Sequence, residues 1–276
     1  MKKDNIIISS FLKSFSAIWK NKSIFLILFI LQILFFWILF STSVTYQTRI
    51  LEDTQAISDY LSRQRLDEVS IAQDVLQQKD ILGEDPLLIG RHFNEIVKNF
   101  RAYLAIFFMS LVIFLSFAWS LAHKLSSKMK FNDLNRLLTR NLVISLFYLM
   151  LIFSFFYSLF NISIAQAADV GVFTKYVPFL IAAPILIYFM FVSLSLPHTT
   201  GLNEILQRTL SIGIKKAHYV LAVYLINIIL LAIPIVLLYY FFEESLLILV
   251  ISLVAMIFSF VFGKLFMVKV VEKIFY

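Results

Sequence analysis

The chain has 276 residues, of which 61% are hydrophobic and 15% charged, and its mean hydropathy is +0.88. Soluble domains contain roughly 45–50% apolar and about 25% charged residues, so this composition indicates an integral membrane protein. The absence of cysteine excludes disulfides and thiolate metal sites, and the net charge of +7 comes from segments that we expect on one side of the membrane, so it does not indicate nucleic-acid binding.

The N-terminal segment, 1–23, predicts a cytoplasmic interfacial helix. Apolar residues recur at helical spacing over 8–20, with Lys13 and Lys20 between them. Such a helix can lie in the membrane interface with its lysines toward lipid phosphates; the alternative is a solvated lead-in. The apolar run that follows, 24–44, is longer than the core of a typical signal peptide. We therefore expect it to be a retained first transmembrane helix.

Residues 45–100 form the only long polar region and hold most of the acidic residues. Apolar residues recur at helical spacing on both sides of a Gly-Glu-Asp-Pro turn signal at 83–86. We expect an extracytoplasmic helical hairpin whose arms continue from the first span and into the second, 101–122.

The remaining elements follow a similar alternation. A cytoplasmic basic loop at 123–141 leads to a third span at 142–164, and a fourth span at 176–196 contains Pro184, which we expect to kink the helix. The later segments are an interfacial helix at 197–216, spans at 217–241 and 245–267, and a tail at 268–276. The predicted fold class is therefore an all-α polytopic membrane protein with six transmembrane helices, interfacial amphipathic helices and the hairpin between helices 1 and 2.

The distribution of basic residues predicts the orientation. With six spans, both termini and both basic loops lie on the side where Lys and Arg outnumber acidic residues, which is the cytoplasmic side. We expect a multi-pass protein of the plasma (inner) membrane with cytoplasmic N- and C-termini. The same residues can contact anionic lipids, although topology signalling alone also explains them: Lys13, Lys20, Lys22, Lys124, Lys128, Lys130, Arg136, Arg140, Arg208, Lys215 and Lys216.

An internal repeat is visible when the N-terminal segment is shifted by 195 residues. The shift places Lys20 on Lys215 and Gln32 on Asn227. The loop at 123–141 aligns only with a one-residue gap. We expect three units, each an interfacial helix followed by a helical pair; the alternative is that cytoplasmic lead-ins simply look alike.

This pattern resembles small six-helix prokaryotic membrane proteins in which cytoplasmic amphipathic helices alternate with membrane helix pairs. They include the membrane domain fused to some glycerophosphodiester phosphodiesterases. The resemblance covers the membrane part and leaves out 46–100. It implies the fold, but it carries over no catalytic residues and no assigned activity.

Polar residues are scarce inside the predicted spans. Arg101 and Lys264 lie at the edges, and no other acidic or basic residue lies further in, which argues against a proton-coupled transporter or pump. Gln32 and Asn227 are the exceptions near the middle of the membrane. They either line a cavity or form interhelical hydrogen bonds worth about 1 kcal/mol. Because glycine is nearly absent from the spans, we expect bulky Phe, Leu and Ile to pack the bundle.

No phosphate-binding loop, dinucleotide fingerprint, metalloprotease motif or nucleophile elbow is present, so the sequence predicts no catalytic, cofactor-binding or metal-binding residues. The leading hypothesis is a non-enzymatic scaffold or accessory subunit. It would bind membrane lipids, and another membrane or extracytoplasmic protein through 45–100, but no nucleic acid. The alternative is a transporter or channel-like protein for a neutral or lipidic substrate, with Pro184 as a moving part. A cavity reaching Gln32 and Asn227 favours the alternative, and solid packing disfavours it.

Overall fold

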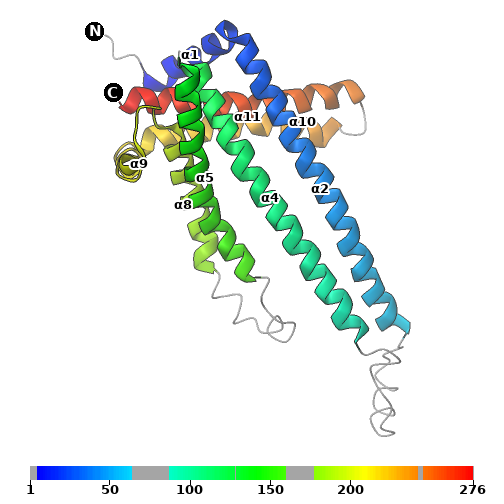
Figure 1. The fold of residues 1–276 in the computed structure, drawn as a ribbon. Coiled ribbons are helices and arrows are strands. Elements are labelled where there is room, and N and C mark those ends of the chain that lie inside the picture. The colour runs from blue at the N-terminus through cyan, green and yellow to red at the C-terminus, as the bar shows by residue number, and fades with distance from the viewer. Residues whose placement is uncertain (1–4, 64–86, 128, 160–176, 242–244, 276) are drawn as a thin grey trace.

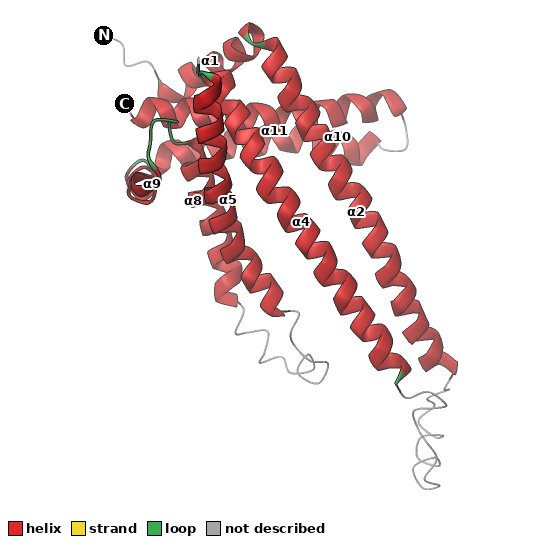
Figure 2. Cartoon of the chain, in the orientation of Figure 1, coloured by secondary structure: helices red, strands yellow, loops and turns green. Residues whose placement is uncertain are grey.

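The computed structural model describes residues 5–63, 87–127, 129–159, 177–241 and 245–275. Within these ranges the protein is all-helical, with eight helices (Figure 2). Five of the described helices are long and apolar enough to cross a membrane. These apolar helices suggest a membrane protein, because an apolar helix of about 20 residues matches the hydrocarbon core of a bilayer.

The first two helices meet at a one-residue corner. Helix α1 (Ile6–Lys20) begins where the Asn5 side chain accepts a 3.1 Å hydrogen bond from the backbone N–H of Ile7. It ends at Asn21, whose N–H bonds to the carbonyls of Ala17 and Ile18. Helix α2 (Lys22–Arg63) starts at the next residue. The caps satisfy terminal backbone groups at both ends of α1.

The same corner recurs 195 residues later. Helix α9 (Leu202–Lys215) ends at Lys216, and α10 (Ala217–Phe241) starts immediately after it. The shift also relates the buried faces of the two short helices: Ser10, Ser14 and Ile18 of α1 correspond to Ile205, Thr209 and Gly213 of α9. The repeat seen in the residues is thus also a repeat of helix boundaries and of buried positions.

The expected third unit differs from these two. Helix α5 (Phe131–Leu159) begins within the predicted basic loop, 123–141, and continues without a break into the predicted third span. The amphipathic segment at its start is therefore the first part of a long helix, and the middle unit lacks the separate interfacial helix that was predicted for it. A one-residue corner, such as Asn21 or Lys216 provides, is missing at this point.

Helices α2 and α4 (Leu88–Ser126) are long neighbours (Figure 1). Helix α2 passes unbroken from the predicted first span into the predicted hairpin arm. The two arms are joined by Nδ1 of His92 and Oδ1 of Asp53, 2.8 Å apart. The expected turn at 83–86 lies outside the described residues.

The two remaining helices are α8 (Val177–Ser195) and α11 (Leu246–Phe275). Helices α5 and α8 run beside the α2–α4 pair, whereas α10 and α11 run steeply across it (Figure 1). Helix α1, α9 and the end of α11 gather at one end of the molecule. The apolar stretch of α8, Leu180–Ser195, is shorter than that of the five long helices. Six spans and the cytoplasmic side of the termini therefore remain predictions.

Small polar residues pack the contact between α4, α5, α8 and α9. Ser116 and Ser120 are buried in α4, and the amide of Asn141 donates a 3.0 Å hydrogen bond to Oγ of Ser120. Oγ of Ser193 lies 2.9 Å from Oγ1 of Thr209. Serine hydroxyls return their hydrogen bonds to the preceding turn and let helices approach closely. Serine therefore packs this contact, in addition to the bulky residues that the sequence predicts, such as Leu125, Phe262 and Phe266, which are fully buried.

Candidate functional site

A cavity of about 430 Å³ lies where the steeply crossing helix pairs meet, with one further wall residue from α8. Helices that cross steeply diverge away from their contact, which leaves room between α2–α4 and α10–α11. The volume is within the range of about 300–1,000 Å³ that is usual for small-molecule sites. Most of its wall is apolar: Phe35, Phe36, Leu39, Phe107, Leu111, Phe114, Leu115, Ala118, Trp119, Phe191, Ile228, Leu231, Phe260 and Met267.

The charged residue in this wall is Lys264 of α11. Its Nζ donates a 2.9 Å hydrogen bond to Oε1 of Gln32 on α2, and it lies 3.4 Å from the carbonyl of Phe260. Helix α11 continues beyond Lys264 to Phe275, so Lys264 lies inside the helix and not at its end. Its place at the edge of the last span stays a prediction.

Asn227 of α10 lies in the same wall. Its Nδ2 donates a 3.3 Å hydrogen bond to the carbonyl of Gly263, the residue before Lys264. The two amides that correspond in the repeat thus line one cavity. Gln32 contacts Lys264 and Asn227 contacts Gly263, which are consecutive residues of α11. The hydrogen bonds to Lys264 and Gly263 are what we expect if the two amides serve as interhelical contacts. Their position in the cavity wall is what we expect if they bind a ligand.

Two further polar atoms near the cavity have no hydrogen-bond partner in the part of the chain that the structure describes. They are Nε1 of Trp119 and Oδ1 of Asn227, and both are buried. Buried polar groups are usually paired, so unpaired ones in a pocket wall are typical of a site that binds something else. The remaining polar wall residues are Tyr224 and Ser259.

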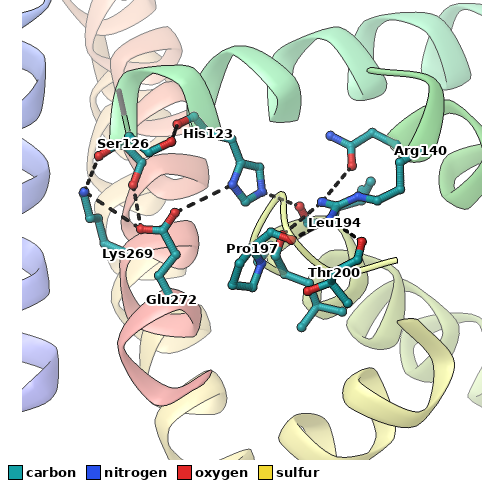
Figure 3. Close-up of polar contacts among 12 residues, drawn as sticks. His123, Ser126, Arg140, Leu194, Pro197, Thr200, Lys269 and Glu272 are labelled. Carbon is teal, nitrogen blue, oxygen red and sulfur yellow. Dashed lines mark hydrogen bonds and ion pairs between the residues drawn. The ribbon is translucent and has the colours of Figure 1, made fainter. Parts of the chain in front are cut away.

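A second polar cluster joins the helix ends next to α1 and α9 (Figure 3). Its centre is Arg140, whose side chain is only 5% exposed. The guanidinium donates to the carbonyls of Pro197 at 2.7 Å and Leu196 at 2.9 Å, and reaches that of Thr200 at 3.5 Å. These carbonyls follow the last turn of α8. Arg140 therefore caps α8, and the prediction that it contacts lipid phosphates is wrong, because its donors point into the protein.

The same cluster ties α4 to α8 and α11 through His123 (Figure 3). Nε2 of His123 lies 2.8 Å from the carbonyl of Leu194, and Nδ1 lies 3.8 Å from Oε1 of Glu272. The other oxygen of Glu272 accepts from Oγ of Ser126 at 2.8 Å, and Lys269 donates to the backbone carbonyl of Ser126 at 2.6 Å. Because the imidazole is completely buried and its contacts reach α8 and α11, this cluster holds helices together.

The other predicted lipid contacts have different surroundings. Lys22 lies 4.7 Å from the ring centre of Trp19, and Arg208 lies 4.9 Å from that of Phe275. Lys124 is half-buried, and Lys128 lies outside the described residues. Arg208 also lies 3.6 Å from the carboxylate of Glu204. The remaining predicted contacts are exposed at the surface: Lys13, Lys20, Lys130, Arg136, Lys215 and Lys216.

Helices α1 and α9 point large apolar side chains away from the protein. The buried side of α1 contains the small residues Ser10 and Ser14 together with Ile18, whereas Ile8, Leu12 and Trp19 are exposed. Helix α9 likewise exposes four apolar residues at a spacing of four: Leu202, Leu206, Leu210 and Ile214. A helix at a water-exposed surface buries its large apolar side chains and exposes its polar ones. The exposed apolar faces of α1 and α9 therefore favour helices that lie in the membrane interface over solvated helices.

Pro184 lies inside α8, and it is not among the residues that line the cavity. The structure therefore gives it no place next to Gln32 and Asn227. Sequence reasoning found these two amides but missed Lys264 and Trp119. The sequence predicts a tail from residue 268, whereas α11 stays helical to Phe275.

The chain matches no protein-family model, no curated protein and no solved structure, so its resemblance to six-helix membrane proteins rests on the pattern of its sequence alone.

Proposed function

We propose that the protein binds a lipidic ligand in the cavity between α2, α4, α10 and α11. The observation that carries the proposal is that the cavity reaches both Gln32 and Asn227 instead of being filled by Phe and Leu. A long apolar wall with a few polar groups suits an amphiphile, since the wall can accept an acyl chain and the polar groups a head group.

The position of the cavity adds support. Its walls come from helices that also expose many large apolar residues, such as Leu225 of α10 and Ile251 of α11. Such surfaces are compatible with a lipid environment, from which an amphiphile would enter. The exposed apolar faces of α1 and α9 would keep the helix ends at the membrane interface.

Trp119 provides an internal reporter for this proposal. The chain has three tryptophans. Trp19 and Trp37 are 75% and 69% exposed, whereas Trp119 is 3% exposed and lines the cavity. The variant Trp19→Phe/Trp37→Phe keeps Trp119 as the only tryptophan. Bromine on an acyl chain quenches tryptophan fluorescence on contact, so brominated fatty acids and fatty alcohols should quench this variant in a saturable manner.

A pair of matched variants makes the test specific. In the Trp119-only protein, Leu111→Phe/Leu231→Phe adds bulk to two walls of the cavity. The control Met109→Phe/Leu225→Phe makes similar changes at exposed positions of the same two helices. Quenching should be lost with the first pair and kept with the second. Absent quenching in the unfilled protein, or equal quenching in both pairs, would overturn the proposal.

The predicted role of residues 45–100 as a surface for a partner protein is a separate proposal. Its support is the pairing of the two arms through Asp53 and His92, which gives the segment a defined shape at its base. Deleting residues 50–98 should abolish recovery of a partner after crosslinking, and unchanged recovery would contradict this role.

A further inference from the structure

We infer that the ligand in this cavity is an amphiphile with an anionic head group, a carboxylate or a phosphate, which binds to Lys264. The inference rests on the proposed lipid-binding function and names the chemistry of the ligand. It begins from the one strongly polar group in a wall that is otherwise mostly apolar.

The surroundings of Lys264 contain no opposite charge in the described part of the chain. Its hydrogen-bond partners there are the neutral oxygens of Gln32 and of the Phe260 carbonyl. The ring centre of Phe260 lies 5.7 Å from Nζ, which adds a weak attraction for a cation. The acidic residue of α11, Glu272, lies eight positions further along the helix and is engaged with Ser126 and Lys269.

A positive charge held in an apolar wall has a large desolvation cost unless an anion compensates it. Charged residues inside membrane helices accordingly pair with each other, with backbone carbonyls or with a ligand. For Lys264 the first option is missing among the described residues. The two neutral acceptors leave at least one of the three donors of an ammonium group available. An anionic head group supplies both the missing charge and the missing acceptor.

Gln32 has a positioning role in this arrangement. Its Oε1 holds Nζ of Lys264 from the α2 side, so that the amine is fixed between α2 and α11 at the cavity. Asn227 holds the preceding residue, Gly263, from the α10 side. The two corresponding amides thus hold this stretch of α11 from two helices, and the apolar wall beyond it is left for the acyl chain.

The test compares head groups on the same brominated chain in the Trp119-only protein. The probes are a carboxylate, a phosphate monoester, a primary alcohol and a trimethylammonium compound. Because a hydrogen bond to a charged group discriminates strongly, one or both anions should reach half-maximal quenching at a concentration about ten- to a hundredfold lower than the alcohol. The ammonium compound should be weakest, because it places a second positive charge next to Lys264.

Variants of Lys264 connect the preference to this residue. Lys264→Gln should remove the difference in half-maximal concentration between the anions and the alcohol, while Lys264→Arg should keep that difference. Equal quenching by all four probes in the unaltered Trp119-only protein would overturn the anionic head group, while the lipid-binding function would stand. Quenching by none of them would overturn both. This first comparison needs no change at Lys264 and holds even if a variant does not fold.

Discussion

Nζ of Lys264 and Oε1 of Gln32 lie 2.9 Å apart and join α11 to α2 in the cavity wall. The two residues are far apart in the chain, and the contact brings the charged side chain of one predicted span to the amide of another. Without Gln32, the amine would face an apolar wall with only the more distant Phe260 carbonyl as a partner.

This contact predicts a non-additive pair of substitutions. Gln32→Leu should lower the free energy of unfolding by about 1–3 kcal/mol, because it leaves a buried donor without its acceptor. The double variant Gln32→Leu/Lys264→Met should recover part of that loss, since both polar partners are removed together. Unfolding in detergent measures the four free energies of the cycle. Losses that simply add would show that the two side chains are not coupled.

Gly263 and Asn227 form a second tight pair. A Cβ added at Gly263 would lie 3.1 Å from Cγ of Asn227 and 3.2 Å from both of its terminal atoms. Gly263→Ala should therefore destabilise the protein by about 1–3 kcal/mol through overpacking, and Asn227→Ala should relieve the effect in the double variant. Thermal unfolding provides the measurement.

Gly90 is the matched control for this pair, because it is also helical and a Cβ there would meet nothing within 4 Å. Gly90→Ala should be neutral or stabilising, since alanine favours a helix by about 1 kcal/mol over glycine. A loss of stability at Gly90 as large as at Gly263 would contradict the close contact with Asn227.

The cap that Arg140 provides for α8 predicts a large difference between two arginines of α5. Arg140→Ala should cost about 3 kcal/mol or more, because it removes charge-assisted hydrogen bonds to the carbonyls of Leu196 and Pro197. Arg136→Ala should change stability by less than about 0.5 kcal/mol, because Arg136 is exposed. Urea or detergent unfolding compares the two, and similar losses would rule out a special role for Arg140.

The outward apolar face of α1 predicts opposite surroundings for two adjacent residues. Because the chain lacks cysteine, a single substitution can be spin-labelled without changing other residues. A label at Leu12→Cys should collide mainly with oxygen, which dissolves in lipid, and a label at Lys13→Cys mainly with a water-soluble nickel chelate. If both labels collided with the chelate at the same rate, α1 would be a helix exposed to water and the interfacial placement would be contradicted.

Much of the helical framework was predictable because it depends on local signals. Apolar runs and amphipathic spacing indicated helices in most of the described ranges, and the shift of 195 residues related the matching corners at Asn21 and Lys216. These features depend on residues that are close in the chain. The continuous helix α5 was missed because nothing in its sequence distinguishes an amphipathic lead-in from the first turns of a long helix.

The site was predictable only in part. Gln32 and Asn227 stood out because they are polar residues in apolar runs, and both line the cavity. Lys264 and Arg140 were assigned to the membrane edge and to a lipid-facing loop, since charge alone does not show which way a side chain points. Their actual partners, Gln32 and the end of α8, lie far away in the sequence. Such pairings follow from how the helices cross, which is a tertiary property.

The most direct test of the central claim is to identify what the purified full-length chain retains from its membrane. Mass spectrometry of the intact protein and of its extracted lipids should find an anionic amphiphile enriched over the surrounding membrane. That enrichment should fall in Lys264→Gln and in Leu111→Phe/Leu231→Phe, but not in Met109→Phe/Leu225→Phe. If the retained lipids had the composition of the bulk membrane in all four proteins, the cavity would not be a binding site for such a ligand.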